Sequence, residues 1–88
     1  MNNVVALQGT ITVTGTSQNL PNNPVVNGVV IAAKSGNTAS IEIGNSSAVT
    51  TTTGFILAAG TSVTVPCSNT NQLWLVGTAN DVYSVLGA

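Results

Sequence analysis

Ionisable side chains are nearly absent from this 88-residue chain. Lys34, Glu42 and Asp81 are its only charged side chains, and it has neither histidine nor arginine. General acid–base catalysis needs a group that titrates near neutral pH. Metal sites need clustered His, Cys, Asp or Glu, and binding to nucleic acids rests on Lys and Arg. We therefore expect no enzyme, no metal or cofactor site and no nucleic-acid partner.

Cysteine and long apolar runs are also lacking. A single cysteine, Cys67, cannot form an internal disulfide, so we expect synthesis in a reducing cytoplasm and a fold without covalent cross-links. The only cation is remote from Cys67 in the sequence, so a small, partly buried thiol is expected there and not a nucleophile. No apolar run approaches the roughly 20 residues of a membrane span, and the N-terminus lacks the features of a secretory signal.

The two carboxylates offer little chemistry. A carboxylate pair can hydrolyse a glycoside when held at a suitable separation, but we expect Glu42 and Asp81 to be surface groups. Glu42 lies in an alternating segment whose polar residues should face outwards. Asp81 is expected to hydrogen-bond within its own Asn80-Asp81 turn.

What the sequence does contain is Val, Ile, Leu and Ala alternating with Thr, Ser, Asn and Gly. A period of two over β-branched residues is typical of strands with one buried face. We expect strands at residues 10–14, 29–33, 38–43, 61–65, 72–76 and 82–86. A polar loop with two prolines should occupy residues 15–24, and no segment has the caps and apolar stripe of a long helix.

These patterns predict one all-β domain over residues 1–88. Six to eight short strands at regular spacing are typical of a small antiparallel β-sandwich or jelly-roll-like barrel. Asn27-Gly28 suits a type I′ hairpin turn, but it could equally mark a bulge or loose entry into the strand that follows. We prefer the bulge or loose entry, because the preceding valine pair is short and follows Pro24.

Two groups of residues are candidates for contact with other protein molecules. Residues 1–8 could form an N-terminal arm, because Val4, Val5 and Leu7 have no obvious partner within a single small sandwich; such an arm would add a strand to a neighbour. Trp74 shares a strand face with Val76. These two residues could fill the core or lie at a subunit contact, where aromatic side chains are enriched.

From residue 28 onwards the chain contains a series of short motifs whose order resembles that in a family of small bacteriophage virion proteins, those that decorate or cement capsid shells. The motifs are GVVIAA at 28–33, IEIG at 41–44, GFILAAG at 54–60, LWLVGT at 73–78 and DVYSV at 81–85. The stretch over which they are spread, residues 28–85, is about two-thirds of the chain. Glu42 stands where such proteins often have an aromatic residue, and Thr61 stands where an acidic residue is common.

The resemblance implies a β-sandwich without catalytic residues that forms a trimer or other oligomer. It also implies the phage major capsid protein as partner and the capsid surface of the virion as location, after synthesis in the host cytoplasm. A decoration protein of this kind would bridge neighbouring capsid subunits and stabilise the shell. The alternatives are a neck, tail or spike component of the phage, or a receptor-binding or glycan-binding module.

Overall fold

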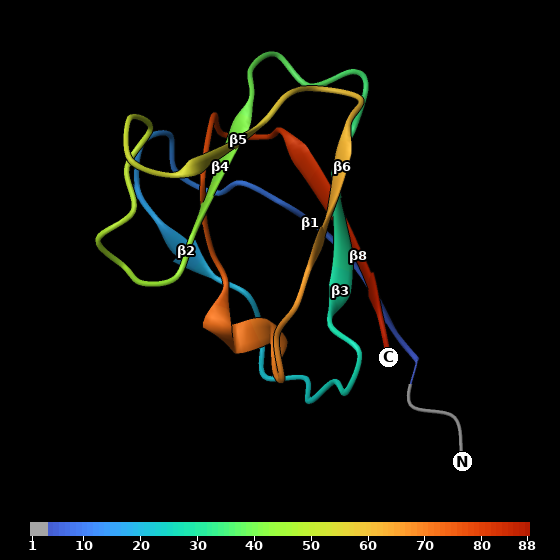
Figure 1. Cartoon of the computed structure of the whole chain (residues 1–88). Helices are drawn as coiled ribbons and strands as arrows, with labels where there is room; N and C mark the ends of the chain where they lie inside the picture. Colours follow the sequence, from blue (N-terminus) through green and yellow to red (C-terminus); the bar gives the residue numbers. More distant parts are fainter. Residues whose placement is uncertain (1–3) are drawn as a thin grey trace.

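The computed structural model describes residues 4–88, which form eight strands in two antiparallel four-stranded sheets (Figure 1). One sheet has the order β1-β8-β3-β6 and the other the order β2-β7-β4-β5. Within the described residues the one helical element is the short 3-10 helix η1. The all-β prediction is confirmed. The elements are β1 (Val5–Thr10), β2 (Gln18–Asn19), β3 (Val29–Ala33), β4 (Ile41–Gly44), β5 (Phe55–Leu57), β6 (Ser62–Val65), η1 (Thr70–Gln72), β7 (Trp74–Val76) and β8 (Val82–Gly87).

The strand pairing is that of a chain folded in half. β4 pairs with β5, β3 with β6, β2 with β7 and β1 with β8, all antiparallel. The β3–β8 and β4–β7 pairs then join these four hairpin-like pairs into two sheets. This strand order is that of an eight-stranded jelly roll. The two sheets share no strand. Of the two forms that the sequence predicted, the molecule is therefore the sandwich and not the closed barrel.

The core lies between the sheets and consists mainly of aliphatic side chains. Ile31, Ile41 and Leu75 are fully buried, and each comes from a strand whose alternate residues face inwards. Ile11, directly after β1, and Leu20, directly after the two-residue strand β2, are also buried. Tyr83 on β8 is 7% exposed, and its burial raises the pKa of the phenol, so it remains a neutral core residue.

The strand predicted at residues 10–14 is displaced towards the N-terminus. β1 ends at Thr10; Ile11 is buried as expected, but Val13 is 55% exposed. The Gln18 side chain explains where the strand ends, because its Nε2 donates to the Thr10 carbonyl (3.1 Å) and its Oε1 accepts from the Thr12 amide (2.9 Å). An amide side chain thus takes the place of a neighbouring strand at that point.

Asn27-Gly28 is not a hairpin turn. The amides of Val26 and Asn27 both donate to the Ala88 carbonyl, at 2.9 and 2.6 Å, and β3 begins directly after Gly28. Gly28 has a φ of 78°, and a Cβ placed there would collide with the Val65 carbonyl oxygen on β6. The chain therefore enters β3 loosely, and the entry requires glycine both for its φ and for the close approach of β6.

Alanine substitutions separate these two requirements. Gly15 has the same φ of 78° but open space around it, and Gly36 has open space and no positive φ. We expect Gly15→Ala to cost about 1–2 kcal/mol and Gly28→Ala about 2–5 kcal/mol, because the second adds a backbone collision. Gly36→Ala should lie within about 0.5 kcal/mol of wild type. Urea unfolding of the three variants measures these differences, and equal losses at Gly15 and Gly28 would contradict the role given to Val65.

The Asp81 carboxylate does not cap its own turn, which corrects the sequence-based expectation; within that turn only the Asp81 amide bonds, to the Thr78 carbonyl at 3.1 Å. Its carboxylate accepts from the Thr38 amide (2.9 Å), the Thr38 hydroxyl (3.0 Å) and the Ala39 amide (3.1 Å), and the residue is 4% exposed. The loop between β3 and β4 is thereby held against the start of β8. The Thr38 backbone hydrogen bond, followed by those from Ala39 and the Thr38 hydroxyl, lowers the pKa of Asp81, although burial acts in the opposite direction.

This lowered pKa predicts a pH dependence of stability. The folded-state pKa lies below the unfolded value of about 3.9, so the contribution is present above that pH and is lost as pH falls through the folded value. We expect the free energy of unfolding of the wild type to fall in this range and that of Asp81→Asn to change much less. Thr38→Val keeps the backbone donor and should retain the pH dependence. Urea unfolding from neutral to acidic pH tests this, and parallel curves for wild type and Asp81→Asn would refute it.

Candidate interaction surface

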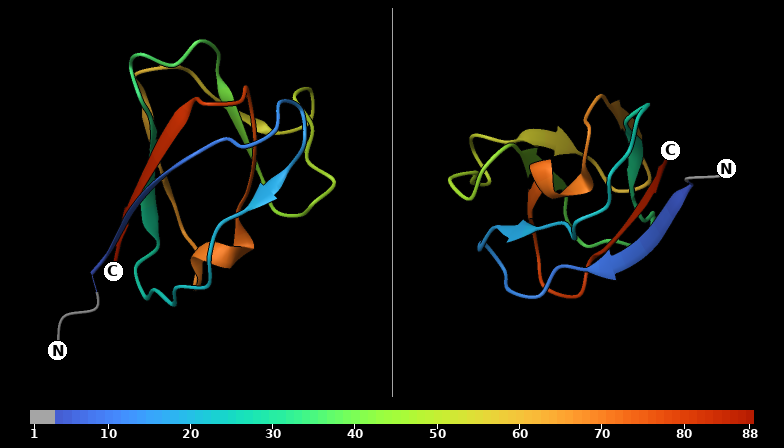
Figure 2. Two further views of the ribbon diagram at one scale, coloured as in Figure 1. Left: turned by 180° about the vertical axis from the view of Figure 1, so that it is seen from behind. Right: turned by 90° about the horizontal axis from the view of Figure 1, so that it is seen from below.

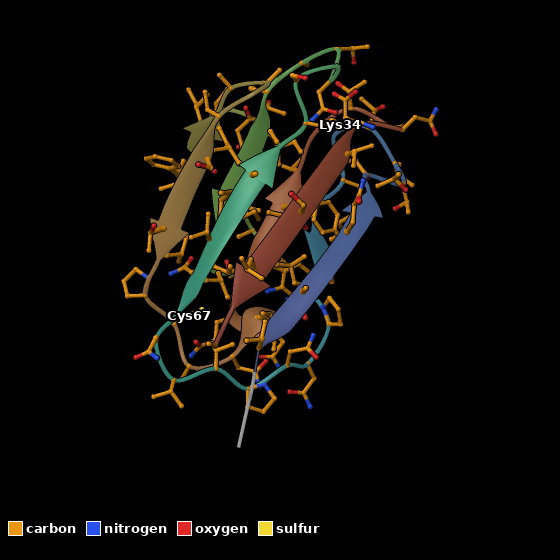
Figure 3. The ribbon with its side chains drawn as sticks, turned by 90° about the vertical axis from the view of Figure 1, so that its right-hand side faces the viewer. Lys34 and Cys67 are labelled. Atoms are coloured by element: carbon orange, nitrogen blue, oxygen red, sulfur yellow. The ribbon has the colours of Figure 1, made fainter. Side chains whose placement is uncertain are left out.

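The outward face of the β1-β8-β3-β6 sheet carries no charged side chain. The strand register places Ala6, Leu86, Val30 and Thr64 in one row across it. A second row contains Gln8, Ser84, Ala32 and Ser62. Leu86 is 57% and Val30 40% exposed. This uncharged sheet face is turned towards the viewer in Figure 3, with Lys34 and Cys67 at its opposite ends.

A shallow hollow of about 440 Å³ crosses the middle of the uncharged sheet face. The small residues Ala6, Ala32 and Ser84 and the larger residues Leu86, Val30 and Gln8 are among those that line it. Exposed apolar residues that are contiguous, and not scattered singly, mark sites of contact with other proteins. The face is thus a candidate interaction surface of aliphatic and hydroxyl groups.

The edge formed by β1 projects backbone groups away from the sheet. Ile11 exchanges both of its backbone hydrogen bonds with the Asn80-Asp81 segment, at 2.9 and 2.8 Å. Since antiparallel strands alternate in direction, Val5, Leu7 and Gly9 face β8, whereas the amides and carbonyls of Ala6 and Gln8 face outwards. No other strand of the described residues lies on that side of β1.

The opposite edge, β6, is built in the same way. Ala33 bonds through both backbone groups to Gly60 and Thr61, so Val63 and Val65 face β3, and Ser62 and Thr64 face outwards. Natural proteins discourage strand addition with charged side chains, especially lysine, or with proline on the edge strand. Neither edge strand contains such a residue, and Pro66 comes only after β6 has ended. Both edges can therefore accept a strand from another molecule.

The predicted contact residues near the N-terminus lie partly within the sandwich. Val5 and Leu7 belong to β1, are half-buried and pack against the core, so the expectation that they have no partner within the sandwich is wrong. The physical reason is that β8 is a central strand and needs β1 on its open side (Figure 2). Val4 is 55% exposed. Of the suggested arm at 1–8, residues 5–8 are strand, and residues 1–3 lie outside the described part of the chain.

Trp74 and Val76 lie on the outward face of the second sheet, but Val76 is fully buried and cannot be a contact residue of the folded protein. Residues 45–54 fold over this face: Val49 packs against Gly44 and Gly54, and a Cβ on Gly54 would also meet Glu42. The Ser17 hydroxyl donates to the Ser47 carbonyl at 2.8 Å, which joins the loop after β1 to this cover. Trp74 is half-buried.

The remaining chemistry-bearing residues are dispersed. Cys67 is a free, half-buried thiol packed against the core. Among residues 4–88 no three His, Cys, Asp or Glu side chains gather into a potential metal site. Within the same residues no helix has the length and apolar character needed to cross a membrane. What the described residues offer on the β1-β8-β3-β6 side is contact area and backbone hydrogen bonds.

Comparison of the chain with protein-family models, with curated proteins and with solved structures found no match. The strand order and the surfaces described above are consequently the basis for a functional hypothesis.

Proposed function

We propose that this protein is a bacteriophage capsid decoration, or cement, protein that binds the assembled shell and bridges neighbouring major capsid subunits. The observation that carries the proposal is the uncharged sheet face with an open strand at each of its two edges. The ordered motifs from residue 28 onwards support it as a resemblance. The jelly-roll strand order is compatible, since viral capsid domains share it, although a fold alone does not define a function.

The two edges also favour assembly of the protein with itself. Because β1, β8, β3 and β6 alternate in direction, β1 of one copy would run antiparallel to β6 of the next if the sheet continued across two molecules. Such a contact joins two different edges, so it closes into a ring, a trimer for example, when the rotation between copies allows. A net charge of −1 provides little repulsion between copies.

Binding that is specific for the assembled state would stabilise the shell by mass action. Repetition of the contact over many equivalent positions would multiply this effect through multivalency. Neither step requires a reactive side chain, which is consistent with a chain that has three charges.

The direct test adds purified protein to undecorated shells of the phage that encodes it and measures copy number and shell melting temperature. We expect occupancy of hundreds of copies per particle and a raised melting temperature. Failure to bind shells, or a copy number of a dozen or fewer, would contradict decoration. The low copy number would instead favour a neck, tail or spike role.

A charge placed on the uncharged sheet face should separate binding from folding. Leu86→Lys changes a residue that is 57% exposed, and Val13→Lys makes the same kind of change in a loop at 55% exposure. We expect Leu86→Lys to weaken shell binding by at least about tenfold, because an unpaired charge would be desolvated in the contact. Val13→Lys should bind like wild type. Co-sedimentation with shells measures both, and equal binding would remove the sheet face from the interface.

The edge contact has its own test in Thr64→Pro. The Thr64 amide faces outwards, so proline there removes a donor from the edge without removing a hydrogen bond to β3. We expect Thr64→Pro to remain folded but to be monomeric in light scattering, and Thr64→Val, which keeps the amide, to assemble like wild type. A folded Thr64→Pro variant that still forms the wild-type oligomer would exclude this edge.

A glycan-binding or receptor-binding role is the second candidate, and one observation favours it. Phe55 on the edge strand β5 is 60% exposed beside Ile56, and lectin domains also use the jelly-roll arrangement. An exposed aromatic ring is a common platform for ligands that stack. The test compares binding of the wild type and Phe55→Ala to glycans, host cells and shells. If the wild type binds glycans or host cells but not shells, and Phe55→Ala loses that affinity, this candidate replaces decoration.

A further inference from the structure

A second hollow lies on the other side of the sandwich, beside β4 and the loops that cover it. It has a volume of about 310 Å³ and is lined by Glu42, Ser40, Thr14, Thr51, Thr78 and Gly77, among others. Glu42 is one of the chain's two carboxylates, and it lies opposite Val76 on the outward face of the β2-β7-β4-β5 sheet. Four hydroxyl-bearing residues from four separate segments thus line the same hollow as one acidic group.

Glu42 is only 4% exposed, which is the feature that sets this hollow apart. Its Oε2 accepts a hydrogen bond from the Ser40 hydroxyl at 2.7 Å. Its Oε1 has no hydrogen-bond or ion-pair partner among residues 4–88. Every fully buried side-chain oxygen or nitrogen in that part of the chain has a hydrogen-bond partner. The unpartnered Oε1 must therefore be accessible, and the hollow is the space that Glu42 lines.

The lining restricts what could bind there. A largely buried carboxylate favours a ligand that brings positive charge and hydrogen-bond donors. Calcium typically takes six to eight oxygen ligands including several carboxylates, whereas this hollow has one. No aromatic ring lines it, so it lacks a stacking surface for a sugar. An ammonium or guanidinium group carries several donors, and the hollow offers it acceptors in Glu42 and in the hydroxyls of Thr51 and Thr78.

We propose that this hollow is a socket for one basic side chain, Lys or Arg, of the protein partner. The inference rests on the proposed function in so far as the partner is the major capsid protein. Within residues 4–88, Lys34, the chain's only cation, forms no ion pair with Glu42, so the counter-charge for this hollow has to come from another molecule, which we assign to the capsid partner. The socket lies on the opposite sheet from the uncharged sheet face, so the two surfaces can be engaged independently.

The socket can be tested on the isolated protein. Methylguanidinium chloride and n-butylammonium chloride are titrated into isotope-labelled protein, with sodium chloride at equal ionic strength as reference. We expect saturable shifts of the Ser40, Gly77 and Thr78 amides, and their loss in Glu42→Gln, which keeps the shape and can still accept from Ser40. Shifts that match sodium chloride, or that persist in Glu42→Gln, would overturn the proposal. Saturation by calcium chloride at lower concentration would also overturn it in favour of a metal site.

Shell binding provides the second measurement. We expect Glu42→Gln to bind shells at least about tenfold more weakly than wild type, because a desolvated basic side chain of the partner would lose its counter-charge. Lys34→Ala should bind normally; loss of binding in this variant would point to a second copy of this chain as the occupant and contradict the proposed partner. If Glu42→Gln binds shells like wild type, the socket fails and decoration stands. If the wild type does not bind shells but the small cations still saturate the Glu42 site, the decoration proposal is wrong and the cation site is retained.

Discussion

The pairing of the first strand with the last is the constraint on which the rest of the structure depends. β8, the last strand, lies between β1 and β3. Its backbone hydrogen bonds are therefore completed only when β1, near the beginning of the chain, pairs with it. This pairing makes β1 one edge of the sheet, and β6, which pairs only with β3, is the other. The backbone amides and carbonyls of Ala6, Gln8, Ser62 and Thr64 point away from the sheet at these edges. The open edges are therefore a direct consequence of how the chain closes on itself.

Scarcity of charge shapes how the loops are held. The Asn37 side chain donates to the Val82 carbonyl (2.9 Å) and accepts from its amide (2.8 Å), as a neighbouring strand would. Gln18 does the same beside β1, and Asn69 and Gln72 form a reciprocal capping box around η1. Neutral side chains thus satisfy backbone groups in the loops, and Asp81 is the one carboxylate used in this way. The result is a molecule whose surface offers contact with little electrostatic discrimination.

The sequence predicted best where strands were dense in β-branched residues and bounded by turn residues. β3 has the predicted bounds, and β6 and β8 differ from prediction by one residue. The strand that became β1 was predicted too late in the chain, because Ala6, Gln8 and Gly9 are weak strand formers, and the short β2 lies inside a segment predicted as loop. The burial of Glu42 could not be predicted, because it arises where the loop after β4 folds back against it, and such a cover has no periodic signal. For Val76 the sequence left burial and a subunit contact both open. The capping box around η1 was not predicted, although its signal, Asn69 and Gln72 three residues apart, is present in the sequence.

The two candidate surfaces differ in what they can contribute to binding. An uncharged face with open strand edges gives contact area and backbone hydrogen bonds, which many partners could match. A single buried carboxylate in a hydroxyl-lined hollow accepts few groups, and it penalises a partner that leaves it unpaired. Specificity in so neutral a chain would therefore rest on Glu42, and adhesion on the opposite sheet. Because the sandwich holds these two surfaces on different sheets, one molecule could contact two neighbours at once, which is the geometric requirement for bridging subunits of a shell.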